Sequence, residues 1–211
     1  MYLDFKNNTN YTKLGEPAKI IKNGGLVIFP TETVYGIGTN GLDKNAIKKL
    51  YSVKQRPLNK PISLLVNNIN MIETVAKNIT DLEYALIQKF FPGPLTIILE
   101  KKEIVPDILT AGSNTIGIRM PANNIALKLI DYAGVPIATP SANISGKPSG
   151  TNVEDIMKDF NTKVDCFIDD GPSKIGLAST IVKVIDGQIH ILRQGSISKK
   201  DIDSVKDALA Y

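Results

Sequence analysis

The chain has 211 residues, 43% of them hydrophobic, and a formal net charge of +4 from 25 basic and 21 acidic side chains. This length supports one sizeable hydrophobic core, and the lone Cys166 and lone His190 exclude an intramolecular disulfide and a standard zinc site. No apolar run approaches the roughly 18 residues that span a bilayer, and the first residues lack a secretory or transit signal, so we expect a cytoplasmic protein.

Helix and strand patterns alternate through the first half of the chain. Pro17 fits the first turn of a short helix that Gly24 and Gly25 would end, and Asp43 is a typical N-cap. Thr80 and Glu83 form a capping-box pattern. The predicted helices run from Pro17 to Lys22, from after Asp43 through Tyr51 and from after Thr80 to Phe90, and the predicted strands cover residues 26–29, 61–66 and 95–99.

The second half continues the alternation and adds a hairpin. Residues 115–120 alternate as a strand, residues 124–133 predict a helix that Gly134 ends, and residues 136–139 and 164–169 predict two further strands. Asp186-Gly187 is the strongest hairpin signal of the chain, between strands 180–185 and 188–193. A last amphipathic helix would begin after Ser198 and carry Ile202, Val205 and Leu209. We therefore predict a single α/β domain over residues 1–211 with a mixed sheet.

A basic window without acids lies between these elements. Residues 44–72 contain no Asp or Glu, and their first half carries Lys44, Lys48, Lys49, Lys54, Arg56 and Lys60. Positive charge without neutralising carboxylates repels itself, so such a window favours a bound anion. Part of it is explained by a solvated helix face, to which we assign Lys48 and Lys49. Because Pro30 to Gly36 just upstream is rich in small donors and acceptors, the two segments together predict a site for a polyphosphate or an RNA backbone.

Two strand ends add polar groups to this site. Arg119 projects from the face opposite Ile116 and Ile118, just before Pro121 ends its strand, and could bind a carboxylate or phosphate or make a structural ion pair. The hydroxyl- and amide-rich segment 139–146 follows another short strand. Its likeness to the segment with Thr31 and Thr33 predicts a second wall of the same pocket.

Other patterns favour structural roles. The letters of Gly36-Ile-Gly38-Thr-Asn-Gly41 match a dinucleotide motif, but the acid that should follow about 20 residues later is missing, so we expect turn-forming glycines. Asp169-Asp170 could hold a metal, although a solvated acid pair is favoured. We expect structural positions for His190 in the hairpin and Cys166 in the core.

Nine short motifs, taken in order, resemble the YrdC family of threonylcarbamoyl-AMP synthases, which act in tRNA modification. The resemblance covers about residues 17–198. The matching segments are Phe-Pro-Thr-Glu-Thr-Val-Tyr-Gly (29–36), Lys-Gln-Arg-Pro (54–57), Lys-Pro (60–61), Phe-Pro-Gly-Pro-Leu-Thr (91–96), Gly-Ile-Arg-Met-Pro (117–121), Thr-Pro-Ser-Ala-Asn-Ile-Ser-Gly (139–146), Asp-Gly-Pro (170–172), Ser-Thr (179–180) and Leu-Arg-Gln-Gly (192–195).

The resemblance implies a fold and a reaction. The fold would be an open, twisted, mixed α/β sheet with flanking helices and a positively charged concave face. The reaction would join L-threonine, bicarbonate and ATP into threonylcarbamoyl-adenylate and release pyrophosphate. Mg²⁺ would accompany ATP, a TsaD-type transferase would use the product, and tRNA is a candidate contact. The chain is similar to the short form of the family, without an additional C-terminal domain.

The resemblance also implies site residues. Lys54 and Arg56 would be catalytic through their contact with the triphosphate. The ATP site would consist of Lys54, Arg56, Lys60, Thr115, Ser141, Asn143, Ser149 and Arg193, and the L-threonine site of Thr33, Arg119, Thr139 and Ser179.

Two alternatives remain at this point. A non-catalytic module could hold tRNA or double-stranded RNA in the same positive concavity, although the chain has no Trp and only 6% aromatic residues for base stacking. The YrdC-like part of hydrogenase-maturation carbamoyltransferases is the second, but those proteins carry further domains for carbamoyl phosphate.

Overall fold

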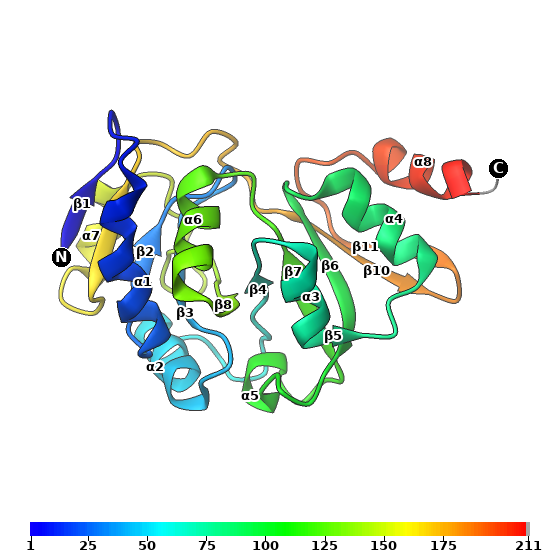
Figure 1. Ribbon diagram of the computed structural model, residues 1–211, viewed down its shortest axis with the longest axis horizontal. Helices are drawn as coiled ribbons and strands as arrows, with labels where there is room; N and C mark the ends of the chain where they lie inside the picture. The colour runs from blue at the N-terminus through cyan, green and yellow to red at the C-terminus, as the bar shows by residue number, and fades with distance from the viewer. Residues whose placement is uncertain (210–211) are drawn as a thin grey trace.

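A computed structural model describes the backbone of residues 1–209 and the side chains of residues 1–206 (Figure 1). The strands are β1 (Tyr2–Asp4), β2 (Val27–Phe29), β3 (Gly36–Asn40), β4 (Leu64–Leu65), β5 (Ala76–Lys77), β6 (Leu95–Lys101), β7 (Thr115–Arg119), β8 (Ile137–Ala138), β9 (Cys166–Asp169), β10 (Thr180–Ile185) and β11 (Gln188–Arg193). The helices are the 3₁₀ turn η1 (Tyr11–Leu14) and α1 (Gly15–Lys22), α2 (Lys44–Lys54), α3 (Ile69–Val75), α4 (Asp81–Phe90), α5 (Asp107–Thr110), α6 (Asn124–Ala133), α7 (Val153–Phe160) and α8 (Lys199–Leu209). The side chain of Leu209 lies outside the described residues.

The strands form one open, mixed sheet, as the sequence predicts. Their order is β1-β9-β2-β3-β8-β4-β7-β6-β10-β11, with β5 paired to β6 off this path. Strands β1, β9 and β2 run parallel, as do β4 with β7 and β6 with β10. The pairs β2–β3, β6–β7 and β10–β11 are antiparallel. Because the sheet does not close, β1 and β11 are left as its two edges.

Two pairs of helices lie toward opposite ends of the molecule, with α3 and α5 between them (Figure 1). Helices α1 and α6 pack against each other at the β1 end, and α4 and α8 pack together at the β11 end. Leu14, Ile21 and Leu129 belong to a buried apolar cluster at the β1 end, whereas Leu86 and Ile202 belong to a larger cluster that extends from the β11 end to Ile28 and Phe160. No helix in the described part of the chain is both long and apolar enough to cross a membrane.

Local signals place most helix ends where the sequence predicts them. The Asp43 carboxylate accepts hydrogen bonds from Asn45 N and Ala46 N, and Thr80 with Glu83 forms the predicted capping box. Gly134 ends α6 in the left-handed conformation that glycine favours. The helix starts and the hairpin are therefore confirmed.

One glycine-rich segment is a strand and not the expected turn. Residues 36–40 form β3, between β2 and β8. A Cβ at Gly36 would lie 2.4 Å from Cγ2 of Thr139, and one at Gly38 would lie 2.6 Å from the Phe29 ring. Glycine is needed at both positions because neighbouring side chains leave no room for a Cβ. Our prediction that these glycines form turns was therefore wrong.

Two predicted strands are shorter than expected, because part of their backbone bonds elsewhere. The predicted strand 61–66 reduces to β4, while Ile62 N donates to the carbonyl of Leu109 (2.9 Å). The predicted strand 136–139 reduces to β8, while Thr139 N donates to the carbonyl of Ser63 (3.0 Å).

Asp169 is a buried residue whose contacts link the N-terminus to the rest of the sheet. Its carboxylate lies 2.9 Å from the Lys6 ammonium, accepts a hydrogen bond from Tyr2 OH and accepts another from Gly171 N (2.9 Å). Tyr35 OH donates to the carbonyl of Gly171 at 2.7 Å. Since Asp169 is buried and paired, our expectation of a solvated Asp169–Asp170 pair was wrong for Asp169, and only Asp170 is exposed. No cluster in the described residues has the ligands for a metal ion.

Candidate active site

A polar pocket of about 210 Å³ opens where several loops meet the ends of β4, β6 and β7. We call it the arginine pocket, because Arg56, Arg119 and Arg193 all line it. The residues that the sequence predicts for the site and that the structure brings to this wall are Thr33, Arg56, Arg119, Thr139, Ser141, Ser149, Ser179 and Arg193. Segments far apart in the sequence thus form one pocket, including the two hydroxyl-rich segments after β2 and β8.

Arg119, the last residue of β7, is almost completely buried at this wall. Its Nε donates to the carbonyl of Gly93 at 3.2 Å, and its Nη2 lies 2.7 Å from Oε2 of Glu32. Burial lowers the pKa of Arg119, and the nearby Glu32 carboxylate opposes that shift. In the described part of the chain, neither Glu32 oxygen nor Arg119 Nη2 makes a well-directed hydrogen bond. Arg119 and Glu32 therefore form the structural ion pair, and the two Glu32 oxygens and Arg119 Nη2 can still form hydrogen bonds with a ligand.

Backbone carbonyls, and not carboxylates, hold the other two guanidinium groups. Arg56 donates through Nε to Lys60 O (3.1 Å) and through Nη2 to Pro61 O (2.9 Å). Arg193 donates through Nε (3.1 Å) and Nη2 (2.8 Å) to the carbonyl of Ser179, and its Nη2 also reaches Ser179 Oγ at 3.1 Å. Burial lowers the pKa of both arginines, and for Arg193 the positive charges of Arg119 and Arg56 lower it further. Three like charges within one pocket favour an anionic ligand.

Lys54 lies behind this wall and does not line it. It is the last residue of α2, which continues past Tyr51, where the predicted helix ends. Its buried ammonium donates to the carbonyls of Ser141 and Asn143, both at 2.5 Å. Burial, and secondly the charge of Arg56, lower the pKa of Lys54 to about 7. The side chain thereby fixes the loop that presents Ser141 to the pocket.

Asn143 stabilises the same loop from within. Its amide donates to the carbonyls of Ile144 (2.9 Å) and Lys147 (2.8 Å), and its Oδ1 accepts from Ser141 Oγ at 2.5 Å. In this structure Asn143 therefore shapes the loop that carries Ser141.

Besides Lys54 and Asn143, two further predicted residues lie away from the pocket wall. Lys60 has an exposed side chain beside the loop that holds Arg56. Thr115 begins β7, whereas Arg119 ends it, and its hydroxyl lies 3.0 Å from Ser113 Oγ. A strand rises about 3.3 Å per residue, so Thr115 lies about four such steps away from Arg119 along β7.

Thr96 and Ser63 line the pocket although we did not predict them for the site. Thr96 Oγ1 lies 2.8 Å from Ser179 Oγ, and this hydrogen bond orients Ser179, which is one of the predicted site residues. A Cβ at Gly117 would lie 2.6 Å from Ser63 Oγ, so this glycine leaves room for the hydroxyl. Thr96 ends the motif 91–96 and could have been found there, whereas Ser63 has no signal of its own in the sequence.

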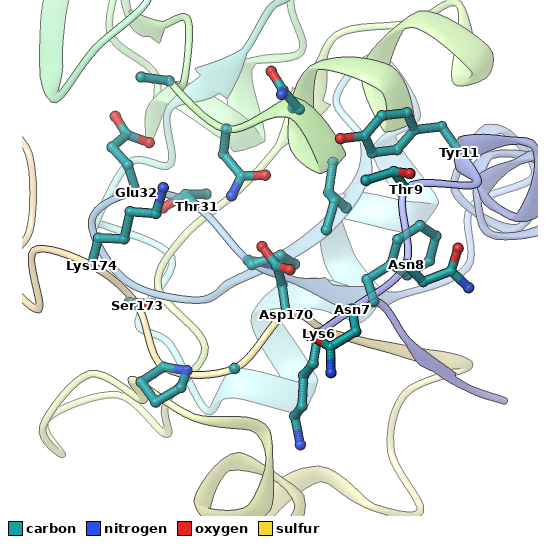
Figure 2. A pocket seen from close by; sticks show the side chains of 18 residues that line it. Lys6, Asn7, Asn8, Thr9, Tyr11, Thr31, Glu32, Asp170, Ser173 and Lys174 are labelled. Carbon is teal, nitrogen blue, oxygen red and sulfur yellow. The ribbon is translucent and has the colours of Figure 1, made fainter.

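A second pocket, of about 310 Å³, lies on the other side of the loop after β2 (Figure 2). We call it the N-terminal pocket; its lining includes Lys6, Tyr11, Glu32, Asp170 and Lys174. Backbone bonds from Ile175 N to Glu32 O (2.9 Å) and from Gly176 N to Thr33 O (2.8 Å) join the segments between the two pockets. Glu32 thus lies in the wall that separates them.

Comparisons with known proteins agree with this architecture. Residues 19–195 match the family model Sua5/YciO/YrdC, described as "Telomere recombination". The chain is 44% identical to the threonylcarbamoyl-AMP synthase of Pyrococcus abyssi over 92% of its own length and 57% of the relative's. It is 46% identical to a putative threonylcarbamoyl-AMP synthase of Methanocaldococcus jannaschii, over 85% of the chain and 84% of that relative.

A solved structure extends the similarity to three dimensions. P. abyssi Sua5 complexed with L-threonine superimposes with a TM-score of 0.94 at 41% identity, covering 97% of this chain and 60% of that one. The chain therefore spans less than two thirds of the length of the P. abyssi protein.

Proposed function

The chain belongs to the Sua5/YciO/YrdC family, and from that premise we propose that it makes threonylcarbamoyl-adenylate from L-threonine, bicarbonate and ATP, with release of pyrophosphate. One observation carries the proposal. The relative that was solved with L-threonine has the same fold at 41% identity, and in this chain eight residues expected for threonine and ATP line one pocket.

The proposed chemistry needs positioning more than a nucleophilic side chain. The threonine amine takes up carbon dioxide, derived from bicarbonate, and loses a proton to become a carbamate. A carbamate oxygen then forms a bond to the α-phosphorus of ATP while the bond to pyrophosphate breaks. Charge develops on phosphate oxygens, so fixed cations and hydrogen-bond donors supply the catalysis. The arginine pocket offers such groups, since backbone carbonyls already orient its guanidinium groups.

The geometry suggests a division of roles. Arg119 would bind the threonine carboxylate, with Thr33, Thr139 and Ser179 around it. Arg56 and Arg193 would bind the phosphates, assisted by Ser141 and Ser149, which line the same pocket. Lys54 would contribute chiefly by fixing the loop of Ser141 in the free protein, and Asn143 would act with it. We propose Lys60 and Thr115 as outer contacts of ATP, because neither lines the pocket.

The remaining partners follow from this reaction. Mg²⁺ would enter as part of the ATP complex and offset the charge of its phosphates. A TsaD-type transferase would take the adenylate and modify tRNA, in the cytoplasm.

Pyrophosphate release is the experiment that tests the proposal. We expect release from ATP and bicarbonate that depends on L-threonine and that is reduced in Lys54→Ala and Arg56→Ala. A folded protein that binds ATP without threonine-dependent release would contradict the synthase reaction. Binding of tRNA with a steep salt dependence would then favour the RNA-binding module.

A further inference from the structure

Three guanidinium groups line the arginine pocket, and among the described residues only Arg119 has a carboxylate beside it. Glu32 lies 2.7 Å from Arg119, and both side chains are more than nine-tenths buried. Arg56 and Arg193 are instead held by carbonyl oxygens, which orient a guanidinium without neutralising it. A carboxylate therefore neutralises the positive charge of the pocket at Arg119, whereas the charges of Arg56 and Arg193 are not neutralised.

We propose that Glu32 is a specificity-determining residue that divides the pocket into two subsites. Around Arg119 it leaves a charge-compensated subsite that suits a net-neutral amino-acid zwitterion. Around Arg56 and Arg193 an uncompensated subsite remains for phosphate groups. This inference rests on the proposed function and adds how one pocket keeps its two substrates apart.

The physical reason is that phosphates compete for any free guanidinium. A polyphosphate carries several negative charges and is attracted by the field of all three arginines, whereas a zwitterion has no net charge. Opposite charges about 4 Å apart attract strongly at a partly buried site. Without Glu32, a phosphate group would therefore occupy Arg119 and exclude the amino acid. With Glu32 present, the repulsion between its carboxylate and a phosphate disfavours that arrangement.

The geometry around Glu32 fits a role toward a ligand. The 2.7 Å contact with Arg119 leaves both Glu32 oxygens and Arg119 Nη2 without a well-directed hydrogen bond among the described residues. Buried polar atoms in this state usually indicate a missing partner. The Glu32 backbone is fixed by Ile175 N at 2.9 Å, and the Glu32 and Lys174 side chains lie at the same side of the N-terminal pocket (Figure 2). The carboxylate thus stays in the wall while a ligand completes the bonds of Arg119.

Calorimetric titration with inorganic pyrophosphate and with L-threonine tests the proposal. In Glu32→Gln we expect pyrophosphate to bind about tenfold more tightly, and we expect threonine to compete with it. Glu32→Asp keeps the charge and should stay within about threefold of the native protein. Glu16→Gln is the matched control, because it removes one negative charge from an exposed pair with Lys19 at 3.7 Å. Unchanged or weaker pyrophosphate binding in Glu32→Gln would overturn the proposal.

A measurement on the native protein covers the case in which Glu32→Gln does not fold. Saturating L-threonine should leave the pyrophosphate dissociation constant within about twofold, because the subsites are separate. Direct competition in the native protein would contradict the division. A native protein that binds pyrophosphate but no threonine would refute the proposed function, and the effect of Glu32→Gln on pyrophosphate would still decide the role of Glu32.

Discussion

The arginine pocket and the N-terminal pocket lie on two sides of one wall, and both draw on residues 30–34, 119–125 and 170–181. The two pockets differ in the groups that hold their basic side chains. In the arginine pocket, carbonyl groups orient Arg56 and Arg193 and leave their charges available. In the N-terminal pocket, Lys6 is already paired with Asp169 and Glu154. In the larger of these two cavities the charge of Lys6 is thus already paired, whereas the smaller one keeps oriented guanidinium charge available.

The largest expected effect concerns the ion pair in the wall. Arg119→Ala would leave the buried Glu32 carboxylate without its partner, and breaking a buried pair in this way costs about 3–5 kcal/mol of stability. Urea unfolding measures this loss. The double variant Glu32→Gln with Arg119→Met should recover most of it. Equal stability of Arg119→Ala and the native protein would show that the pair is not buried as described.

The second effect concerns the uncompensated end of the arginine pocket. Arg56→Ala should lower the rate of threonine-dependent pyrophosphate release by about ten- to a hundredfold, the scale of one charge-assisted hydrogen bond. Lys48→Ala is the control, because Lys48 lies on the exposed face of α2 and its substitution removes the same charge. Equal rates in the two variants would remove Arg56 from the site.

A third effect concerns the proton on Lys54, whose pKa is about 7. At pH 8 the free side chain is therefore mostly neutral, and a bound triphosphate nearby would raise its pKa, so ATP binding should take up about half a proton or more. Calorimetry in two buffers of different ionisation enthalpy measures this uptake. It should vanish in Lys54→Met, and identical uptake in that variant would assign the proton elsewhere.

The smallest effect is expected in the N-terminal pocket. Asp170→Asn and Lys174→Gln change exposed side chains outside the arginine pocket, so each should alter the rate of pyrophosphate release by less than about twofold. A loss similar to that of Arg56→Ala in either variant would mean that the two pockets act as one.

The sequence predicts the mixed sheet and most helix ends because these depend on local signals. Asp43, Thr80 and Gly134 act within one turn of their own helix, and all three behave as predicted. Strand β3 could not be predicted in this way. Its Gly36 and Gly38 are required by close contacts with Thr139 and Phe29, and these contacts form only in the folded protein.

The site was predictable in its composition but not in its contacts. Arg119 could be placed at the end of a strand, and an ion pair was one of the two readings, but no pattern named Glu32 as the partner. Lys54 is predicted among the phosphate ligands, and no pattern named the loop carbonyls that accept its hydrogen bonds in this structure. Both outcomes depend on segments about 87 residues apart, such as Arg119 with Glu32 and Lys54 with Ser141.

The contacts of Asp169 link the arginine pocket to the first strand. The loop that follows Asp169 carries Ser179, whose carbonyl orients Arg193, while Tyr2 and Lys6 hold Asp169 from the other side. A truncation that removed these first six residues would take away the Tyr2 and Lys6 contacts of this carboxylate and leave it only its hydrogen bonds from Gly171 N and Tyr35 OH. Trimming the N-terminus for crystallisation, or fusing a tag so closely that β1 cannot pair with β9, would therefore disturb the loop that orients Arg193 without changing any residue of the arginine pocket.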